Sequence, residues 1–572
     1  MPLTPKVYEI LHLLVQNNGH MLGKDEMIKA VWPDSFVEEG NLTRNISTLR
    51  AALGEGADNY SYIETIPTRG YRFVAGVKEF HRGTNGLAQI EVAEADLVKG
   101  DEETNARQSA RTRKVIESLA VLPLVNSTTD EEAEHLSDGI TESIINSLSH
   151  LSELRVMARS TVFRFKGKDI SPQEIGRALN VNAVLTGRII QLGDRLVIGT
   201  ELVDVADGSQ LWGETYNRPP ADIFEVQAEI SREISEKLRL RLTGDQKRRL
   251  FKRHTENTEA YQLYLKGRYY WNKRTPEYLE RAITYFEQAI ETDPAYALAY
   301  AGLADSYILL HTLPPTEVMP RAKVAALKAL EIDDSLAEGH SSLAKVEDNY
   351  VWDWASAARE YEKAIELNPN YATARQWYAE HLAARGRHAE GIAEITRPLD
   401  VDPLSLSINN AVARQFYFAR RFDEAIEQCR RTLEMDPHFL PAHYRLGGVY
   451  LQKRMYQEAI SEYQTTVELS ARRPVMLAGL AYAYAVAGKR KEALRLLGDL
   501  QKLSRKQHIG PTLLVQIYAG LGETDQAFEC LEKIYAGRYP LMIYLKADPA
   551  FDSLRSDPRF EDLLGRIGPS ES

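Results

Sequence analysis

The sequence is poor in cysteine. Only two occur among 572 residues, Cys429 and Cys530. Two cysteines about a hundred residues apart indicate neither a disulfide framework nor a four-cysteine metal site. We expect both to be small buried hydrophobic residues, in keeping with a reducing cytosol.

Long apolar runs are also absent. No stretch approaches the roughly 18 to 20 apolar residues that span a bilayer, and the opening Met-Pro-Leu-Thr-Pro-Lys lacks the charged-then-apolar layout of a signal peptide. These features predict a cytoplasmic protein without a membrane partner.

The chain has no excess of basic residues, because 70 Lys and Arg stand against 81 Asp and Glu, a net charge of −11. This balance argues against a protein that coats nucleic acid or adheres to membranes through its general charge. Any contact with DNA must therefore be local. The length exceeds what one hydrophobic core supports, so several domains are expected.

The first segment contains three predicted helices. Val7, Ile10, Leu11 and Leu14 follow the helical spacing, a second helix is expected from Lys24 to Trp32, and a third from Asn41 to Leu53. The third helix contains no acidic residue, although the segment through Lys78 has nine acidic residues against eight basic ones. Its apolar stripe should face the core, which turns a polar, basic face outward. Such a face suits phosphates and guanine edges.

A predicted β-hairpin follows this helix. Tyr62 to Ile66 and Tyr71 to Val74 should form its strands, joined by Pro67-Thr68-Arg69-Gly70. Gly70 is expected to supply the freedom in φ that the turn needs. Arg69 at the tip can enter a minor groove or contact a phosphate, and Arg72 can contact a phosphate. The alternative is a solvated helix and hairpin with incidental arginines.

The opening Leu3-Thr4-Pro5-Lys6, the helix Leu42 to Leu53 and the ending Thr68-Arg69-Gly70-Tyr71-Arg72-Phe73 resemble the OmpR/PhoB-type winged-helix family. The resemblance implies a recognition helix in the major groove and a wing on the neighbouring minor groove. The small β-sheet that usually precedes the first helix in this family is expected to be missing, and control by phosphorelay is not expected. The predicted DNA-binding residues are Asn41, Thr43, Arg44, Ser47, Thr48, Arg50, Thr68, Arg69 and Arg72.

Residues 79–113 are polar, rich in Glu, Ala, Asp and Arg, and poor in aromatic residues, which predicts a flexible linker. Membrane-anchored ToxR-like regulators place a transmembrane helix after such a winged helix, and this sequence has none. Because the linker lets the winged helix move independently and no receiver-like domain precedes it, we expect control to come from oligomerisation or from occlusion by the repeat array.

Residues 114–243 predict a small α/β domain. Short strands and helices alternate to Leu179, and three strands then follow over Ala183 to Gln191, Arg195 to Val205 and Leu211 to Tyr216. The stretches Leu119 to Leu124, Ser137-Asp138-Gly139-Ile140-Thr141 and Ile175 to Leu179 resemble the TolB amino-terminal (FlgO-like) domain.

Asp138 and Glu142 fall on one helix face at i, i+4, but no histidine, metal pair or phosphate loop accompanies them. A solvated acidic face is the favoured interpretation over an acid/base pair. We predict no catalytic residue, no cofactor and no metal, and hence no enzyme.

Repeats dominate residues 258–568. Asn368-Pro369, Asp402-Pro403 and Asp436-Pro437 are 34 residues apart, and Ala425, Ala459, Ala493 and Ala527 keep the same period. A period of 34 with small residues at helix crossings is the tetratricopeptide (TPR) repeat. About eight units are expected, with a cap from Asp548 to Gly568.

The concave surface of such an array is a candidate site for an extended peptide or a partner helix. The expected groove residues are Lys345, Gln376, Glu380, Asn410, Arg414, Tyr417, Tyr444 and Tyr482. The recurring Lys and Asn with which some TPR proteins clamp acidic chain ends are not in register here, so binding of chaperone tails is not expected. The alternative is that these positions are ordinary surface residues.

The predicted fold is multidomain: a winged helix (α+β) at 1–78, the linker at 79–113, the α/β domain at 114–243 and an all-α TPR solenoid at 258–568. The favoured function is a sequence-specific DNA-binding transcriptional regulator whose TPR array binds a protein or peptide, with possible assembly of copies on DNA. The alternative is a TPR scaffold with a vestigial winged helix.

Overall fold

A computed structural model of the chain describes residues 5–17, 20–32, 37, 39–53, 62–66, 69–74, 116–126, 131–151, 153–192, 195–219, 222–238, 244, 252–503 and 510–568. The predicted linker at 79–113 lies outside these ranges. Two compact units result, residues 1–111 and residues 112–572.

The first unit combines three helices with a three-stranded antiparallel sheet in the order β1-β3-β2. Helix α1 spans Pro5–Gln16, α2 Lys24–Val31 and α3 Glu39–Leu53, while the strands are β1 Met21–Gly23, β2 Ile63–Ile66 and β3 Gly70–Phe73. The apolar stripes of all three helices meet over the sheet in one core. The sequence interpretation missed strand β1, because three residues are too few to show a strand period.

Gly70 is required for a different reason from the one expected. Its φ is not among the positive values found in the described residues. A Cβ atom on Gly70 would instead lie 1.9 Å from the carbonyl oxygen of Leu22. Glycine is therefore needed so that β1 can approach β3, and the prediction of a turn-specific φ was wrong.

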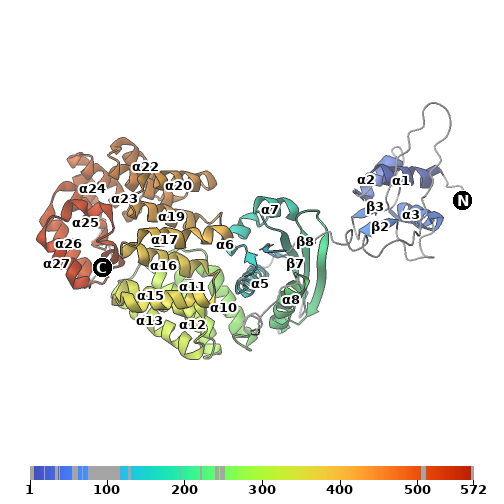
Figure 1. Cartoon of the computed structure of the whole chain (residues 1–572), viewed down its shortest axis with the longest axis horizontal. Coiled ribbons are helices and arrows are strands. Elements are labelled where there is room, and N and C mark those ends of the chain that lie inside the picture. The colour runs from blue at the N-terminus through green and yellow to red at the C-terminus, as the bar shows by residue number, and fades with distance from the viewer. Residues whose placement is uncertain are drawn as a thin grey trace, which may run out of the picture. The chain divides into compact units, whose positions relative to one another are not determined.

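The second unit begins with an α/β part, residues 116–238, here called the middle domain (Figure 1). Its strands β4 Ser118–Val121, β5 Val125–Asn126 and β6 Arg155–Val156 run parallel to their neighbours in the sheet. The long antiparallel strands are β7 Ala183–Leu192, β8 Arg195–Asp204 and β9 Gln210–Arg218. The sheet order is β6-β4-β7-β8-β9, with β5 also on β7.

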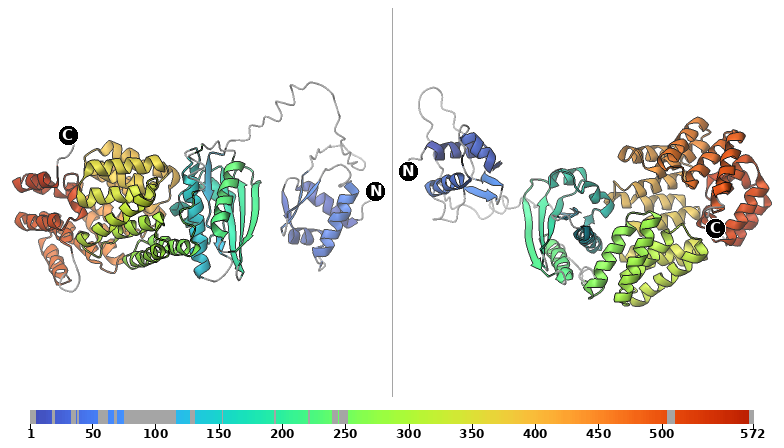
Figure 2. Two further views of the ribbon diagram at one scale, coloured as in Figure 1. Left: turned by 90° about the horizontal axis from the view of Figure 1, so that it is seen from below. Right: turned by 180° about the vertical axis from the view of Figure 1, so that it is seen from behind.

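Helices α5 Glu131–Ser149 and α8 Ile223–Lys237 lie on the same face of this sheet (Figures 1 and 2). The shorter elements are α6 Arg159–Val162, η1 Phe163–Phe165 and α7 Pro172–Ala178. Helix α7 starts where expected, because Ser171 and Glu174 form a reciprocal capping box with Pro172 at the first helical position. In the turn between β8 and β9, Gly208 has a positive φ of +74°.

The repeats form eight consecutive helix pairs in the part of the chain that the structure describes (Figure 1). The pairs are α10 Thr258–Trp271 with α11 Pro276–Thr292, α12 Ala297–Leu309 with α13 Pro315–Ile332, α14 Ala337–Val346 with α15 Trp354–Leu367, α16 Ala372–Ala384 with α17 His388–Thr396, α19 Leu406–Phe418 with α20 Phe422–Met435, α21 Leu440–Gln452 with α22 Tyr456–Leu469, α23 Pro474–Val486 with α24 Arg490–Leu503, and α25 Thr512–Leu521 with α26 Thr524–Ala536. A π-helical segment, η3 Glu347–Val351, precedes α15, and α18 Pro398–Val401 follows α17.

Small residues sit at the helix crossings, as the repeat pattern predicted. The periodic alanines Ala425, Ala459, Ala493 and Ala527 are fully buried. The ring of Tyr463 occupies the space that side chains at Gly447 and Gly479 would otherwise fill. The period therefore reports packing, because two antiparallel helices cannot close around bulky side chains at their contact.

The C-terminal cap starts earlier than Asp548. It comprises two 3-10 helices, η4 Pro540–Tyr544 and η5 Pro549–Leu554, followed by α27 Pro558–Ile567. Gly568, just beyond α27, lies next to the ring of Trp354 at the start of α15. The last repeat and its cap thus come back to the third repeat, and the array closes on itself.

Candidate functional site

Helix α3 presents one polar face to solvent. Leu42, Ile46 and Leu49 are at most 1% exposed and hold the opposite face in the core of the first unit. The outward positions agree with the predicted set and are all exposed: Asn41, Thr43, Arg44, Ser47 and Thr48. The acid-free stretch identified in the sequence therefore forms one continuous surface of side chains.

Arg50 has a structural role that the sequence did not indicate. It is half-buried, and its guanidinium donates hydrogen bonds to the carbonyl oxygen of Ile63 at 2.6 Å and to the hydroxyl of Thr65 at 2.7 Å. The hydroxyls of Thr43 and Tyr71 also lie 3.3 Å apart. Helix α3 is thereby fixed to both strands of the hairpin. A DNA contact by Arg50 stays a prediction.

The hairpin exposes Arg69 at its tip. The Arg69 amide donates to Ile66 at 3.1 Å, and the amide of Lys24 donates to the Arg69 carbonyl at 3.0 Å, so the backbone of the tip is held while the side chain is exposed. Arg72 is paired within the sheet, donating two hydrogen bonds to Glu64 at 2.9 and 2.7 Å. Thr68 lies outside the described residues.

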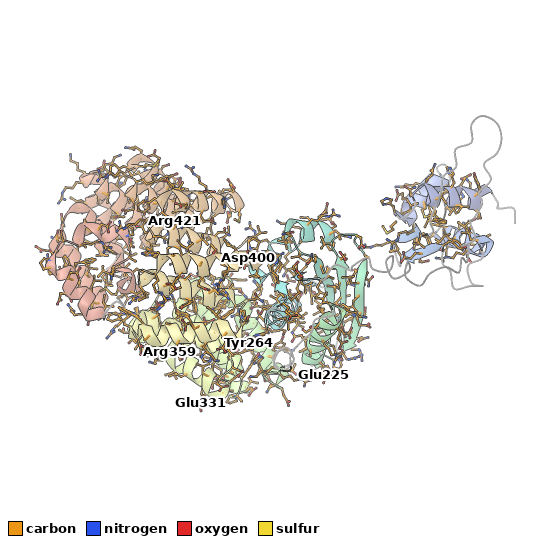
Figure 3. The ribbon with its side chains drawn as sticks, in the orientation of Figure 1. Glu225, Tyr264, Glu331, Arg359, Asp400 and Arg421 are labelled. Carbon is orange, nitrogen blue, oxygen red and sulfur yellow. The ribbon has the colours of Figure 1, made fainter. Side chains whose placement is uncertain are left out.

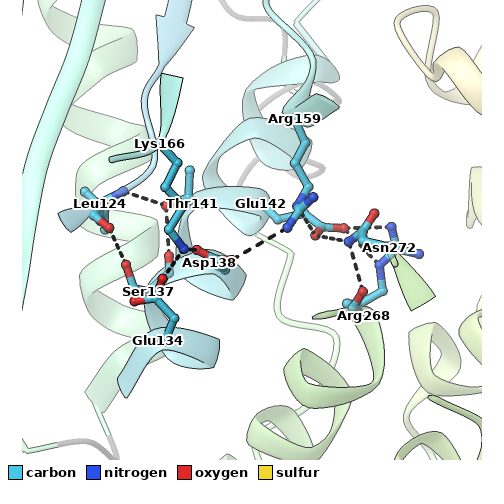
Figure 4. A network of polar contacts seen from close by, with 10 residues as sticks. All are labelled: Leu124, Glu134, Ser137, Asp138, Thr141, Glu142, Arg159, Lys166, Arg268 and Asn272. Atoms are coloured by element: carbon cyan, nitrogen blue, oxygen red, sulfur yellow. Dashed lines mark hydrogen bonds and ion pairs between the residues drawn. The ribbon is translucent and has the colours of Figure 1, made fainter. Parts of the chain in front are cut away.

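The acidic pair on α5 is buried, not solvated as the sequence interpretation held. Asp138 and Glu142 are only 5% and 6% exposed. Figure 4 shows their partners: Lys166 pairs with Asp138, while Arg159 and Arg268 reach Glu142. The helix face that was expected to be exposed to solvent is instead covered by α6 on one side and by the first repeat on the other.

The two carboxyl groups respond differently to this burial. Burial raises the pKa of Asp138, although Lys166 and Arg159 oppose the shift. Burial also acts to raise the pKa of Glu142, but Arg268 and Arg159 outweigh it and the pKa is lowered. Glu142 is thus a buried carboxylate that two guanidinium groups keep charged. Its environment is that of a structural ion pair.

The middle domain binds the turns that join successive repeats. Thr161 donates to Asp402 at 2.7 Å, Ser160 also donates to Asp402, and Asn368 donates to Ser149 at 3.2 Å. These turns carry the periodic Asp-Pro and Asn-Pro pairs seen in the sequence. The periodic polar residues therefore have a second use, because they form one edge of the array on which the middle domain rests.

Further contacts extend this junction along the array. Arg164 donates to the carbonyl oxygens of Leu404 and Met435, each at 2.9 Å. Arg155 donates to the carbonyl oxygen of Asp400 at 3.0 Å, and Figure 3 shows Asp400 where the array meets the middle domain. The sequence analysis predicted the middle domain and the repeat array as separate domains, whereas in the structure they belong to one compact unit.

A cavity of about 130 Å³ lies between the middle domain and the first repeats, with Tyr264, His150 and His254 among its lining residues. Burial lowers the pKa of His254 to about 4, although Asp333 opposes the shift. The lining groups bond to one another, as where Lys252 reaches Asp333 at 2.6 Å. The geometry assigns no ligand to this cavity.

The predicted groove residues do gather on the first helices of repeats three to seven. We call this surface the inner face and define it by Lys345 on α14, Gln376 and Glu380 on α16, Asn410, Arg414 and Tyr417 on α19, Tyr444 on α21, and Tyr482 on α23. Glu380 is its central anion: Lys345 donates to it at 2.8 Å, Gln376 at 3.3 Å, and Arg414 forms an ion pair with it. These cations lower the pKa of Glu380 to about 2 against the effect of burial.

The inner face is not the open groove that the sequence predicted. Lys345, Tyr417 and Tyr482 are 6%, 4% and 6% exposed, and Tyr417 donates its hydroxyl hydrogen bond to Asp548 of the cap at 3.0 Å. The chain covers part of its own inner face. Sequence reasoning missed this because nothing in a repeat period shows where the cap will fold.

Comparison with known proteins places three families along the chain. Residues 1–73 match "Transcriptional regulatory protein, C terminal". Residues 115–232 match "HilA/YgeH-like transcriptional regulator, second domain". Residues 263–296, 353–399 and 411–474 match tetratricopeptide repeats. The resemblance of the middle domain to TolB stays a prediction.

Three curated relatives indicate the range of similarity. Putative adenylate cyclase 3 of Rhizobium meliloti is 34% identical over 231 residues, which is 40% of this chain and 39% of that protein. The transcriptional regulator HilA of Salmonella typhimurium is 22% identical over 408 residues, 70% of this chain and 66% of HilA. The transcriptional activator CadC of Escherichia coli is 36% identical over 78 residues, 14% of this chain and 15% of CadC. The chain thus spans less than two thirds of the length of each relative.

Among the described residues, the helices all lack the length and apolar composition that a membrane span requires. Within the same described ranges, no three or more His, Cys, Asp or Glu side chains are grouped so that they could hold a metal ion.

Proposed function

We propose that this chain, which joins an OmpR/PhoB-type winged helix to a HilA-like domain and TPR repeats, is a sequence-specific DNA-binding transcriptional regulator. Glu39 in the first turn of α3 is exposed and pairs with Lys24 at 2.8 Å. The observation that carries the proposal is the exposed face of α3 from Asn41 to Thr48, which has no acidic side chain and lies opposite a buried apolar stripe. A face of this composition is suited to the major groove. The family match of residues 1–73 supports the same assignment.

The proposed roles follow the positions of the side chains. Asn41, Thr43, Arg44, Ser47 and Thr48 lie on the exposed face of α3, where they can meet base edges and phosphates. Arg69 at the hairpin tip is proposed to enter the neighbouring minor groove. Arg72 is proposed to contact a phosphate after exchange of its partner Glu64. Thr68, outside the described residues, stays a DNA contact predicted from the sequence. Arg50 is proposed to act chiefly by fixing α3 to the hairpin.

The rest of the chain is proposed to work as one regulatory block. The many hydrogen bonds between the middle domain and the repeat turns support a rigid body. We infer a protein or peptide partner for the TPR array, a cytoplasmic location, assembly of copies on DNA, and no catalytic activity. The name of the R. meliloti relative describes that protein, and no residue of this chain is proposed for cyclase chemistry.

The test measures binding of the full-length chain to duplex DNA from its own promoter region. Fluorescence anisotropy monitors the binding at increasing salt concentrations. Affinity should fall steeply, with a logarithmic slope of about −0.9 per phosphate contacted. Arg44→Ala or Arg69→Ala should weaken binding by about 1 to 3 kcal/mol, and only a variant that loses a base contact should relax sequence preference.

Arg431→Ala serves as the matched control, because Arg431 is an exposed arginine in the repeat array with only an i,i+4 ion pair. It should leave DNA affinity unchanged. Binding that is indifferent to both Arg44 and Arg69 would favour the alternative, a repeat scaffold with a vestigial winged helix.

A further inference from the structure

A segment of the cap lies against the inner face. This segment, residues Pro540–Leu554, comprises η4 and η5, and we call it the internal segment. Three of its side chains, Tyr544, Asp548 and Asp552, are four residues apart. Tyr544 contacts Glu380, Asp548 contacts Tyr417, and Asp552 contacts Arg420, two residues beyond α19, so all three side chains face the repeats.

The opposite side of the internal segment is apolar and belongs to the last repeat. Met542, Leu545, Phe551 and Leu554 are at most 2% exposed and pack in one cluster with residues of α25 and α26. The segment is therefore anchored to the eighth repeat by apolar contacts. Towards repeats four to six, Ala550 belongs to their apolar cluster, and the other contacts are polar and aromatic.

Tyr544 makes the aromatic contact. Its ring stacks on Phe418 with ring centres 5.2 Å apart and planes 16° apart. Its hydroxyl donates to Glu380 at 3.4 Å. The inner face thus provides an aromatic platform with an acceptor at the position of a tyrosine hydroxyl.

The two aspartates meet donors and cations. Asp548 accepts the hydrogen bond of Tyr417, and Asp552 accepts two from Arg420 at 2.6 and 2.7 Å. Burial raises the pKa of the Asp548 carboxyl group, and Arg445 on α21 is a further guanidinium that opposes this shift by attracting the carboxylate charge. The face opposite the internal segment therefore complements an acidic ligand, because its cations are spaced to meet carboxylates.

The internal segment leaves part of this face unsatisfied. The Nε atom of Arg445, the Nε atom of Arg414 and the Oδ1 atom of Asn410 are buried and form no hydrogen bond within the described residues. A buried polar group without a partner is unfavourable. A ligand that met these three atoms as well as the existing contacts would bind better than the segment now in place.

We propose that the part of the inner face on α16, α19 and α21, together with Arg420, binds an acidic segment of a partner protein, one with an aromatic side chain followed by carboxylates four and eight residues later. Tyr544, Asp548 and Asp552 hold this site as an internal ligand that the partner displaces. The proposal rests on the partner-binding role given to the array under the proposed function, and it names the chemistry of that partner.

The test uses a fluorescein-labelled peptide with the sequence of residues 538–556 of this chain as the probe, and a scrambled peptide as its control. The full-length variant Asp548→Asn/Asp552→Asn weakens the hold of the internal segment. The peptide should bind this variant at least tenfold more tightly than it binds the unaltered chain. Circular dichroism of the variant and of the unaltered chain checks that their helix contents are the same.

Charge exchange locates the site. Adding Arg420→Glu to the double variant should abolish binding, and a peptide carrying Asp552→Arg should restore it. Arg420→Gln is the milder second variant and should weaken binding at least tenfold without rescue by that peptide. The side chain of Arg420 is about half exposed, 49%, so both changes are accommodated.

Equal affinity for the double variant and the unaltered chain, or for the scrambled peptide, would overturn the proposal. So would a double variant that dimerises in gel filtration and takes up no peptide, because a second copy would then be the occupant. DNA binding is measured on the same preparations. If the chain binds DNA but not the peptide, only this inference is refuted. If it binds the peptide but not DNA, only the regulator assignment is refuted.

Discussion

Arg268 on α10 donates two hydrogen bonds, 2.9 and 2.7 Å long, to one carboxylate oxygen of Glu142 on α5. The pair joins the first repeat to the middle domain; Glu142 is buried, and 16% of the Arg268 side chain is exposed. Asn272 donates to the other oxygen at 2.9 Å. Glu142 is satisfied on both oxygens, so this contact is a strong determinant of how the two parts dock.

Replacing Glu142 by Ala should destabilise the second unit strongly. The change leaves Arg268 without its anion and Arg159 with only the more distant Asp138, at 3.8 Å. Removing one partner of a fully buried pair typically costs about 3 to 5 kcal/mol, and these partly buried arginines should bring the loss to the lower end of that range. Urea denaturation followed by circular dichroism measures the loss. Arg431→Ala, which breaks an exposed ion pair on α20, is the control and should change stability by less than about 0.5 kcal/mol. Similar losses for both variants would contradict a buried, structural role for Glu142.

Two glycines of the array should respond in opposite directions to the same substitution. A Cβ atom on Gly479 would lie 2.6 Å from the ring of Tyr463, whereas one on Gly498 in α24 would meet nothing within 4 Å. We expect Gly479→Ala to cost about 1 to 3 kcal/mol through overpacking. Gly498→Ala should stabilise by about 0.5 to 1 kcal/mol, because alanine favours the helix. Thermal unfolding of both variants checks the sign of each change.

Stability should depend on pH through Asp305. Burial raises the pKa of its carboxyl group to about 6, although Ser342, Arg268 and Arg274 oppose the shift. The folded chain holds this proton more tightly than the unfolded chain, whose aspartates titrate near 3.9. The stability that this group contributes is therefore present below about pH 4 and is lost as the pH rises through about 6.

Asp305→Asn should remove this loss of stability at higher pH. The variant should gain about 2 to 3 kcal/mol over the unaltered chain at pH 7.5, and the gain should shrink towards zero near pH 4. Melting temperatures measured across this pH range test the prediction. Asp334→Asn, the same change at an exposed turn position, should show no such trend. A gain independent of pH would indicate a packing effect instead.

Arg50 should act through the hairpin. Arg50→Ala removes two hydrogen bonds from a charged donor, each worth about 1.5 to 3 kcal/mol when shielded and less at this half-exposed site. We expect faster hydrogen exchange in β2 and β3 of the full-length chain, together with weaker DNA binding. Arg44→Ala should weaken DNA binding while hydrogen exchange stays unchanged. Weaker DNA binding by Arg50→Ala without faster exchange would assign Arg50 to a direct DNA contact.

The sequence predicted the features that depend on near neighbours along the chain. The exposed face of α3 followed from the positions of Leu42, Ile46 and Leu49, because a helix brings residues three and four apart to the same side. Most strands of the middle domain were predicted within a few residues. The Asp138 and Glu142 interpretation failed, because their partners Arg159, Lys166 and Arg268 lie well beyond the reach of a local pattern.

By itself, the sequence determined a helix with an exposed polar face, an alternating α/β segment and a solenoid of eight repeats, since each is encoded by a spacing of apolar and small residues. Only the tertiary structure decided which charges are buried, why Gly70 must be glycine, and what covers the inner face. Contacts such as Tyr417 with Asp548 join residues 131 positions apart. Their formation depends on how all the intervening helices pack, and no local spacing records it.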